Sequence, residues 1–300
     1  MSLRITDGIR YQTMLANMKT AQKGTGDLVE QLGTGKRINH PSDDPAGAQS
    51  LIEWSSARSE IAQYQDQISS TDLWLQTTDL ALGRVEALVE QVADLAAGNV
   101  SSGTGERQAA IDTIEAVRTE LLSLANETCG DRYLFAGTNA DEAAFSIATD
   151  AFGNRTYTYE GSGDGLTVAV GRQATLEYST TGDDVFYENG TSVFRILEDL
   201  STALASGDSA AIGQAADDLE TLSTRVLEAQ SINGIRQDRL ESARAYLTNL
   251  DAKLADLVDK TETADTAALA VQFSQQELAL EASYKLASRV GNLSILDFMK

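Results

Sequence analysis

The feature that most constrains this chain is a seven-residue apolar repeat in its C-terminal third. It is interrupted by a polar break at Asn233 and Arg236. The members of this stripe are Ile212, Ala215, Leu219, Leu222, Val226, Ala229, Leu240, Ala243, Leu247, Leu250, Leu254, Leu257, Ala264, Ala268, Val271 and Leu278. Alternating spacings of three and four residues place these side chains on one narrow face of a helix, which is typical of a coiled-coil seam.

A second stripe with the same period lies in the N-terminal third. Its members are Trp54, Ala57, Ile61, Tyr64, Ile68, Leu75, Leu82, Val85, Val89, Val92 and Ala96. An apolar face of this length must be covered, so each stripe predicts a partner helix, and the other stripe is the nearest candidate. The helix that carries the second stripe is expected to run from Pro45 to about Ala97.

Composition excludes several classes of function. The formal charge of −22 argues against nucleic acid and against anionic membrane surfaces, because both attract clusters of Lys and Arg. One cysteine and one histidine exclude an internal disulfide and make a zinc site improbable. No apolar run approaches the length of a membrane span, and the first residues lack the apolar core of a cleaved secretory signal. We therefore expect no metal, no cofactor, no nucleic acid and no membrane partner.

The N-terminal region predicts a helix over about residues 5–32 that stops at Gly33 or Gly35. Both prolines of the chain then fall in the segment 40–47. Asp44 is suited to cap a helix and Pro45 to begin it. The competing interpretation makes Asp43 and Asp44 a metal or acid–base pair, but adjacent carboxylates in a capping turn are far more often structural. We expect a cap.

The period changes from helical to strand-like at Arg132. Segments 133–135, 155–159, 166–170 and 174–178 are rich in β-forming residues and are separated by Gly, Asn and Asp. The glycine-rich run 161–165 is not followed by Lys-Ser/Thr, so it predicts a turn and not a phosphate-binding loop. The helical pattern resumes at Phe194 and breaks near Gly207. Residues 131–190 therefore predict a small antiparallel β insert, and we expect the helices to survive deletion of residues 140–188.

The predicted fold is mainly α: a long antiparallel coiled-coil or helical-bundle rod formed by the N- and C-terminal halves, with the small antiparallel β insert at its tip. Several segments of this chain resemble the flagellin family. They are Gly35-Lys36-Arg37-Ile38-Asn39, Ser42-Asp43-Asp44-Pro45-Ala46-Gly47, Glu262-Thr263-Ala264-Asp265 and Asn292-Leu293-Ser294-Ile295-Leu296. Two further segments are similar to the hook–filament junction branch of that family: Arg132-Tyr133-Leu134-Phe135-Ala136-Gly137-Thr138 and Val193-Phe194-Arg195-Ile196-Leu197.

The resemblance implies a structural protein of the bacterial flagellum, secreted without a cleaved signal peptide by the type III flagellar export apparatus and an export chaperone. It implies flagellin and the hook-side junction protein as partners, with self-association in a ring. It also implies three parts: an inner terminal-helix domain (1–40 and 265–300), a helical rod domain (41–130 and 191–264) and a small β domain (131–190). The function that follows is a structural adaptor that joins the hook-side junction to the flagellin filament.

Two groups of site residues follow from this resemblance together with the apolar character of the terminal helices. The expected subunit interface consists of Ile5, Ile9, Leu15, Met18, Leu278, Leu286, Val290, Leu293, Leu296 and Phe298. The expected inter-domain turn consists of Arg37, Asn39, Asp43, Asp44 and Pro45. The alternative to a subunit interface is that the apolar C-terminal residues form a core within one subunit.

Two alternatives to the junction adaptor remain open from the sequence. One is a short filament-forming flagellin with a reduced outer domain. The other belongs to a different class: a hydrolase or metal enzyme in the β insert that uses carboxylates such as Asp164, Glu177, Asp183 and Asp184. No nucleophile motif, histidine cluster or cysteine pair supports an enzyme, so we expect none.

Overall fold

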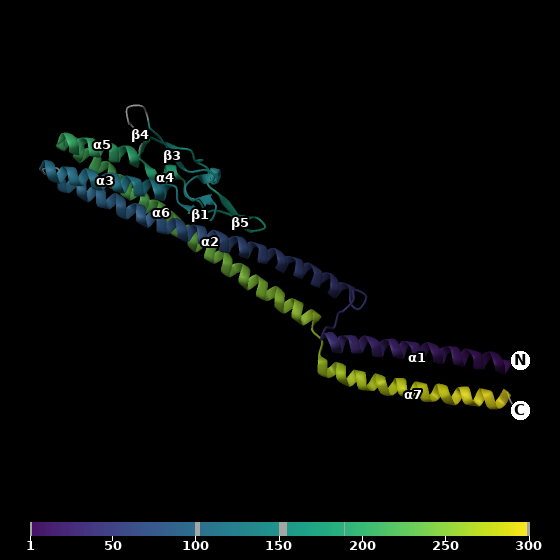
Figure 1. The fold of residues 1–300 in the computed structure, drawn as a ribbon. Helices are drawn as coiled ribbons and strands as arrows, with labels where there is room; N and C mark the ends of the chain where they lie inside the picture. The colour runs from purple at the N-terminus through teal and green to yellow at the C-terminus, as the bar shows by residue number, and fades with distance from the viewer. Residues whose placement is uncertain (1, 100–102, 150–154, 189, 299–300) are drawn as a thin grey trace. The chain divides into compact units, whose positions relative to one another are not determined.

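The computed structural model describes residues 2–99, 103–149, 155–188 and 190–298 (Figure 1), with side chains described except for 2–8, 10, 11, 188 and 289–298. The helices are α1 (Ser2–Thr34), α2 (Pro45–Asn99), α3 (Thr104–Ala125), α4 (Gly182–Phe186), α5 (Val193–Ser206), α6 (Ser209–Glu262) and α7 (Thr266–Phe298), with a 3-10 turn at Gly137–Asn139. The strands are β1 (Thr128–Cys129), β2 (Arg132–Tyr133), β3 (Phe145–Thr149), β4 (Arg155–Tyr159), β5 (Thr167–Gly171), β6 (Ala174–Glu177), β7 (Tyr187–Glu188) and β8 (Thr191–Ser192).

Long helices thus dominate, and the described strands pair as antiparallel hairpins: β1 with β2, β3 with β4, β5 with β6 and β7 with β8. The expected class, mainly α with long helices and a small antiparallel β insert, is confirmed. The chain divides into two compact units. One comprises residues 1–60 and 249–300, and the other comprises residues 61–248.

In the second unit, the two apolar stripes pair with each other as predicted. Residues Ile61, Ile68, Leu75, Leu82, Val89 and Ala96 of α2 are buried, and so are Ile212, Leu219, Val226, Leu240 and Leu247 of α6. The pairing is antiparallel, because residue numbers that rise along α2 meet numbers that fall along α6: Gln65 contacts Thr248, Asp72 contacts Arg244, and Leu75 contacts Asn233. The stripe does not continue in one helix to Leu278, because α6 ends at Glu262.

The β insert shares its core with the helices of this unit. Phe194 at the start of α5 stacks on Tyr157 of β4, with ring centroids 4.7 Å apart, and lies 5.4 Å from the ring of Phe145. Phe186 in turn lies 5.3 Å from both Phe145 and Phe135. The expectation that residues 140–188 can be deleted is therefore corrected, since deletion would remove Phe145 and Phe186 from a core that α2, α3, α5 and α6 also line.

Three of the four predicted strands are confirmed as β4, β5 and β6, whereas β1, β3, β7 and β8 were not predicted. The segment 133–135 is not a strand beyond Tyr133, because Leu134 and Phe135 turn inward and are fully buried. The sequence pattern missed β3, whose only buried side chain is Phe145; the other four residues of the strand are exposed. A single buried position does not produce the period-two alternation by which strands are recognised.

Candidate functional site: the polar turn and the terminal helix pair

The first unit contains a polar turn, defined here as residues 35–44 together with 261–265, that connects four helices. Helix α1 ends at Thr34, and Gly35 follows in the left-handed conformation with φ of 70°. Its N–H donates to the carbonyl of Gln31 at 2.9 Å. Glycine adopts this conformation at little cost, so Gly35 stops the helix at one of the two predicted positions.

The two connecting segments hydrogen-bond to each other like a short piece of antiparallel sheet. The N–H of Arg37 donates to the carbonyl of Glu262 at 2.6 Å, and the N–H of Ala264 donates to the carbonyl of Gly35 at 3.0 Å. Lys36 bridges to Thr263 in the same ladder and forms an ion pair with the side chain of Glu262. The link between α1 and α2 is thereby tied to the link between α6 and α7.

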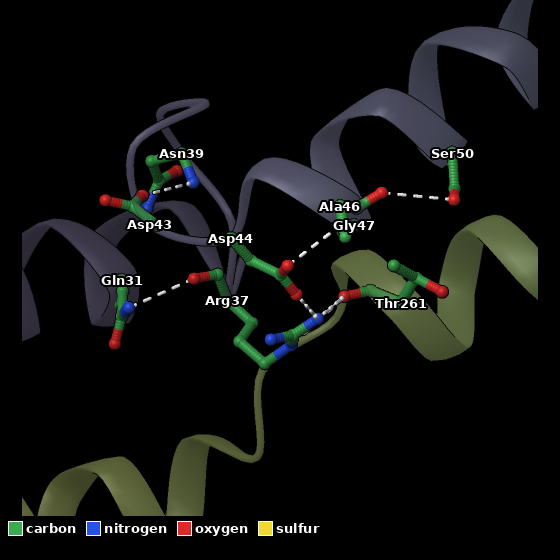
Figure 2. A network of polar contacts seen from close by, with 9 residues as sticks. All are labelled: Gln31, Arg37, Asn39, Asp43, Asp44, Ala46, Gly47, Ser50 and Thr261. Atoms are coloured by element: carbon green, nitrogen blue, oxygen red, sulfur yellow. Dashed lines mark hydrogen bonds and ion pairs between the residues drawn. The ribbon is translucent and has the colours of Figure 1, made fainter.

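The guanidinium of Arg37 lies at the centre of this turn (Figure 2). Its Nε and Nη2 atoms donate to the carbonyl of Thr261 at 3.2 and 3.0 Å, and Nη2 also donates to Oδ2 of Asp44 at 3.1 Å. The carbonyl of Arg37 accepts a hydrogen bond from Gln31 Nε2 at 3.0 Å. Arginine suits this position because its planar fork offers several fixed donors to oxygens on different elements.

Asp44 is the cap of α2, as expected. Its Oδ1 accepts the N–H of Gly47 at 2.9 Å, and Pro45 occupies the first helical position. A Cβ at Gly47 would lie 2.6 Å from Oδ2 of Asp44 and 2.7 Å from Cδ1 of Ile38, so a larger residue at this position would displace the capping carboxylate or Ile38. The N–H of Gly47, and then the guanidinium of Arg37, lower the pKa of Asp44.

Asp43 holds the outer part of the turn. Its Oδ2 accepts the backbone N–H groups of His40 at 2.8 Å and Asn39 at 3.1 Å, and the bond from His40 is the main cause of its lowered pKa. A carboxylate with a lowered pKa stabilises the folded state above its unfolded pKa and loses that contribution as the pH falls through the folded value. Asp43 and Asp44 therefore act as anionic acceptors for protein donors. Within the described residues, no three His, Cys, Asp or Glu side chains gather as metal ligands.

The terminal helices α1 and α7 form an antiparallel pair in the same unit (Figure 1). Gln276 Nε2 donates to the carbonyl of Ala21 at 3.4 Å, and a Cβ at Gly24 would lie 3.0 Å from the same nitrogen. The weak helix former Gly24 thus allows α7 to approach α1 closely. Farther along the pair is a hollow lined by Ile9, Thr13, Met14, Asn17, Ser283 and Leu286.

Several aliphatic side chains of this pair lie in solvent. Leu278 is 68% exposed, Leu286 58%, Ile9 57% and Leu15 38%, whereas Met18 is half-buried. The side chains of the other expected interface residues, Ile5, Val290, Leu293, Leu296 and Phe298, lie outside the part of the chain for which side chains are described. The assignment of these residues to a subunit interface stays a prediction.

Arg37, Asp43 and Asp44 were assigned to the turn from the resemblance to the flagellin family, but the partners of Arg37 elsewhere in the chain were not predicted. Thr261 contributes only its backbone carbonyl, and Gln31 lies on a helix among many polar residues. Every residue has a backbone carbonyl, so the residue type does not show which carbonyl accepts a hydrogen bond.

In the described part of the chain, no helix is both long enough and apolar enough to span a bilayer.

Comparison with known proteins agrees with this architecture. Residues 5–140 match the family model described as the bacterial flagellin N-terminal helical region. Flagellar hook-associated protein 3 of Escherichia coli (strain K12) is 24% identical over 99% of this chain and 100% of its own length. Flagellar hook-associated protein 3 of Salmonella typhimurium is 25% identical, over 98% of each chain.

A solved structure has the same fold. The structure of a putative flagellar hook-associated protein from Vibrio parahaemolyticus superposes with a TM-score of 0.68 at 21% identity, over 74% of this chain and 100% of that one. Together these matches confirm the resemblance to the flagellin family. Within that family, the two hook-associated proteins 3 match this chain nearly end to end.

Proposed function

We propose that this chain is a structural adaptor subunit of the bacterial flagellum that joins the hook-side junction to the flagellin filament. The likeness to two hook-associated proteins 3 over almost the whole of each chain supports this role. The structural observation that carries it is the α1–α7 pair, in which Leu278, Leu286 and Ile9 are all more than half exposed. Ile9 and Leu286 line one hollow on this pair, and a contiguous exposed apolar patch of this kind favours a surface that a partner covers.

The interface of this adaptor lies on the two terminal helices. It comprises Ile5, Ile9, Leu15, Met18, Leu278, Leu286, Val290, Leu293, Leu296 and Phe298. These residues belong to the inner domain (1–40 and 265–300), while 41–130 with 191–264 form the rod and 131–190 the β domain. The polar turn, through Arg37, Asn39, Asp43, Asp44 and Pro45, joins the inner domain to the rod.

Flagellin and the hook-side junction protein are the partners of such an adaptor, and copies of the chain associate in a ring. The chain reaches the outside of the cell through the type III flagellar export apparatus with the aid of an export chaperone. It is not an enzyme. Asp43 and Asp44 support a structural role, because their carboxylates accept hydrogen bonds from backbone N–H groups and from Arg37.

The position of the protein in the flagellum tests this function. Gold-labelled antibodies raised against the purified chain are expected to mark one short zone per flagellum, at the boundary between hook and filament. A strain that lacks the gene is expected to have hooks without filaments and to recover both filament and motility when the gene is restored. Label along the whole filament would instead support the alternative, a short filament-forming flagellin.

A further inference from the structure

The β5–β6 hairpin lies at the edge of the core of its unit. Among the described residues of the hairpin, 167–177, only the side chain of Leu176 is buried, and it is 9% exposed. The ladder is also irregular, because the register shifts between Ala169 and Gly171. A two-stranded hairpin is marginally stable in water by itself. The order of this hairpin therefore depends on how it is docked against the helices.

The polar break in the α6 stripe provides part of that docking. Arg236 donates through Nη2 to Oε1 of Glu177 at 2.7 Å, at the end of β6, and through Nη1 to the hydroxyl of Thr180 at 3.2 Å. The side chain of Arg236 is 15% exposed and Thr180 is buried. Asn233, the other residue of the break, is fully buried and donates from Nδ2 to the carbonyl of Leu75 at 3.0 Å. The break thus connects α6 both to α2 and to the hairpin.

On the α2 side, the segment that follows β6 covers a tryptophan. The ring of Tyr178 meets Trp74 edge-to-face with centroids 5.8 Å apart, and the guanidinium of Arg132 lies 5.7 Å from the centre of the Trp74 ring. Trp74 is 5% exposed, and its Nε1 has no hydrogen-bond partner among the described residues. A buried donor without an acceptor is unfavourable, whereas water would satisfy it if the cover moved away.

We propose that residues 166–178 form a flap that undocks from α2 and α6 without unfolding of the core, and that Arg236 is its latch. Three observations point to this: the hairpin has one buried side chain, its attachment to α6 is polar, and Tyr178 next to it packs on Trp74, whose buried indole N–H is unsatisfied. Elements with few buried apolar contacts are the ones that open locally while the rest of a domain stays folded. Arg236, in the polar break of α6, therefore determines how long the flap stays docked.

Tryptophan fluorescence tests this directly. In a Trp54→Phe background, Trp74 is the sole tryptophan, and quenching by acrylamide measures its exposure. Arg236→Ala and, separately, Glu177→Ala are expected to increase the open fraction about three- to fivefold, the effect of losing one partly exposed ion pair. Arg195→Ala, which removes an exposed ion pair within α5, is the matched control and should leave quenching unchanged.

Hydrogen exchange shows where any opening occurs. Amides of residues 167–177 should exchange faster in both latch variants, while those of α3 and α5 keep their protection. Glu177 is exposed, so its variant folds even if loss of Arg236 disturbs α6. Unchanged quenching and exchange in both variants would overturn the latch, and faster exchange throughout α3 and α5 would show core unfolding in place of a flap.

Discussion

Replacing Leu278 and Leu286 with aspartate is expected to abolish incorporation of the protein into the flagellum while leaving the free protein folded. Both side chains lie on α7 and are more than half exposed, so the free protein accepts a charge there at little cost. In an assembly that covers this helix, each new carboxylate would be buried without a partner, at a cost of several kcal/mol. Few mutations separate folding from assembly as sharply.

The measurement compares thermal unfolding of the purified variant with motility of cells that lack the wild-type protein. Gln275→Asp, also on an exposed position of α7, is the control for a new carboxylate on this helix, because it adds one aspartate without removing an aliphatic group. Normal motility of the double variant would show that this face is not a subunit interface. A lower unfolding temperature would show that the face is part of a core within one subunit.

Arg37→Ala is expected to loosen the polar turn. The variant loses the hydrogen bonds to the Thr261 carbonyl and the ion pair with Asp44, so the end of α6 and the start of α2 are no longer held by one side chain. Amides of Gly47 and Ala264, which donate inside this network, should exchange about five- to tenfold faster, as expected for loss of charge-assisted hydrogen bonds. Hydrogen exchange followed by mass spectrometry measures this.

Arg37→Lys keeps the charge but not the planar fork, and it should lie between wild type and alanine. Arg195→Ala again serves as the control, because it removes an exposed ion pair elsewhere. If Arg37→Ala leaves the exchange of both amides unchanged, the backbone ladder alone holds the turn and the central role of Arg37 is wrong.

The long helices could be predicted from the sequence because their apolar side chains repeat every seven residues over many turns. The predicted start at Pro45 is the observed start. Of the two predicted stops of the first helix, Gly35 is the observed one and Gly33 lies inside α1, and the predicted break near Gly207 coincides with a left-handed glycine at the end of α5. Such signals are local: a cap, a proline and a glycine each act on the backbone next to them. Local signals of the same kind predicted the cap at Asp44 and the helix start at Pro45, whereas Arg37, Asn39 and Asp43 were assigned to the turn from the resemblance to the flagellin family.

What the pattern could not supply are contacts between residues far apart in the chain. Arg37 meets the backbone of Thr261, and Phe194 meets Phe145 and Tyr157 of the insert. In the sequence, Asn233 and Arg236 only interrupt the apolar repeat. In the structure, Asn233 donates to a carbonyl of α2 and Arg236 donates to Glu177 at the end of β6. Leu278 belongs to the apolar repeat and is nevertheless exposed. The exposure of such a residue depends on where the partner helix lies and not on the position of the residue in the repeat.

Chemical protection of α7 tests most directly the claim that the terminal helix pair is the assembly interface. In a Cys129→Ser background, Leu278→Cys is treated with a maleimide in the free protein and in isolated flagella. Ile147→Cys, on β3 and 45% exposed, is the internal reference. We expect the cysteine at position 278 to react readily in the free protein and far more slowly in flagella, while the reference reacts in both. Equal reactivity at position 278 in the two states would contradict an interface there.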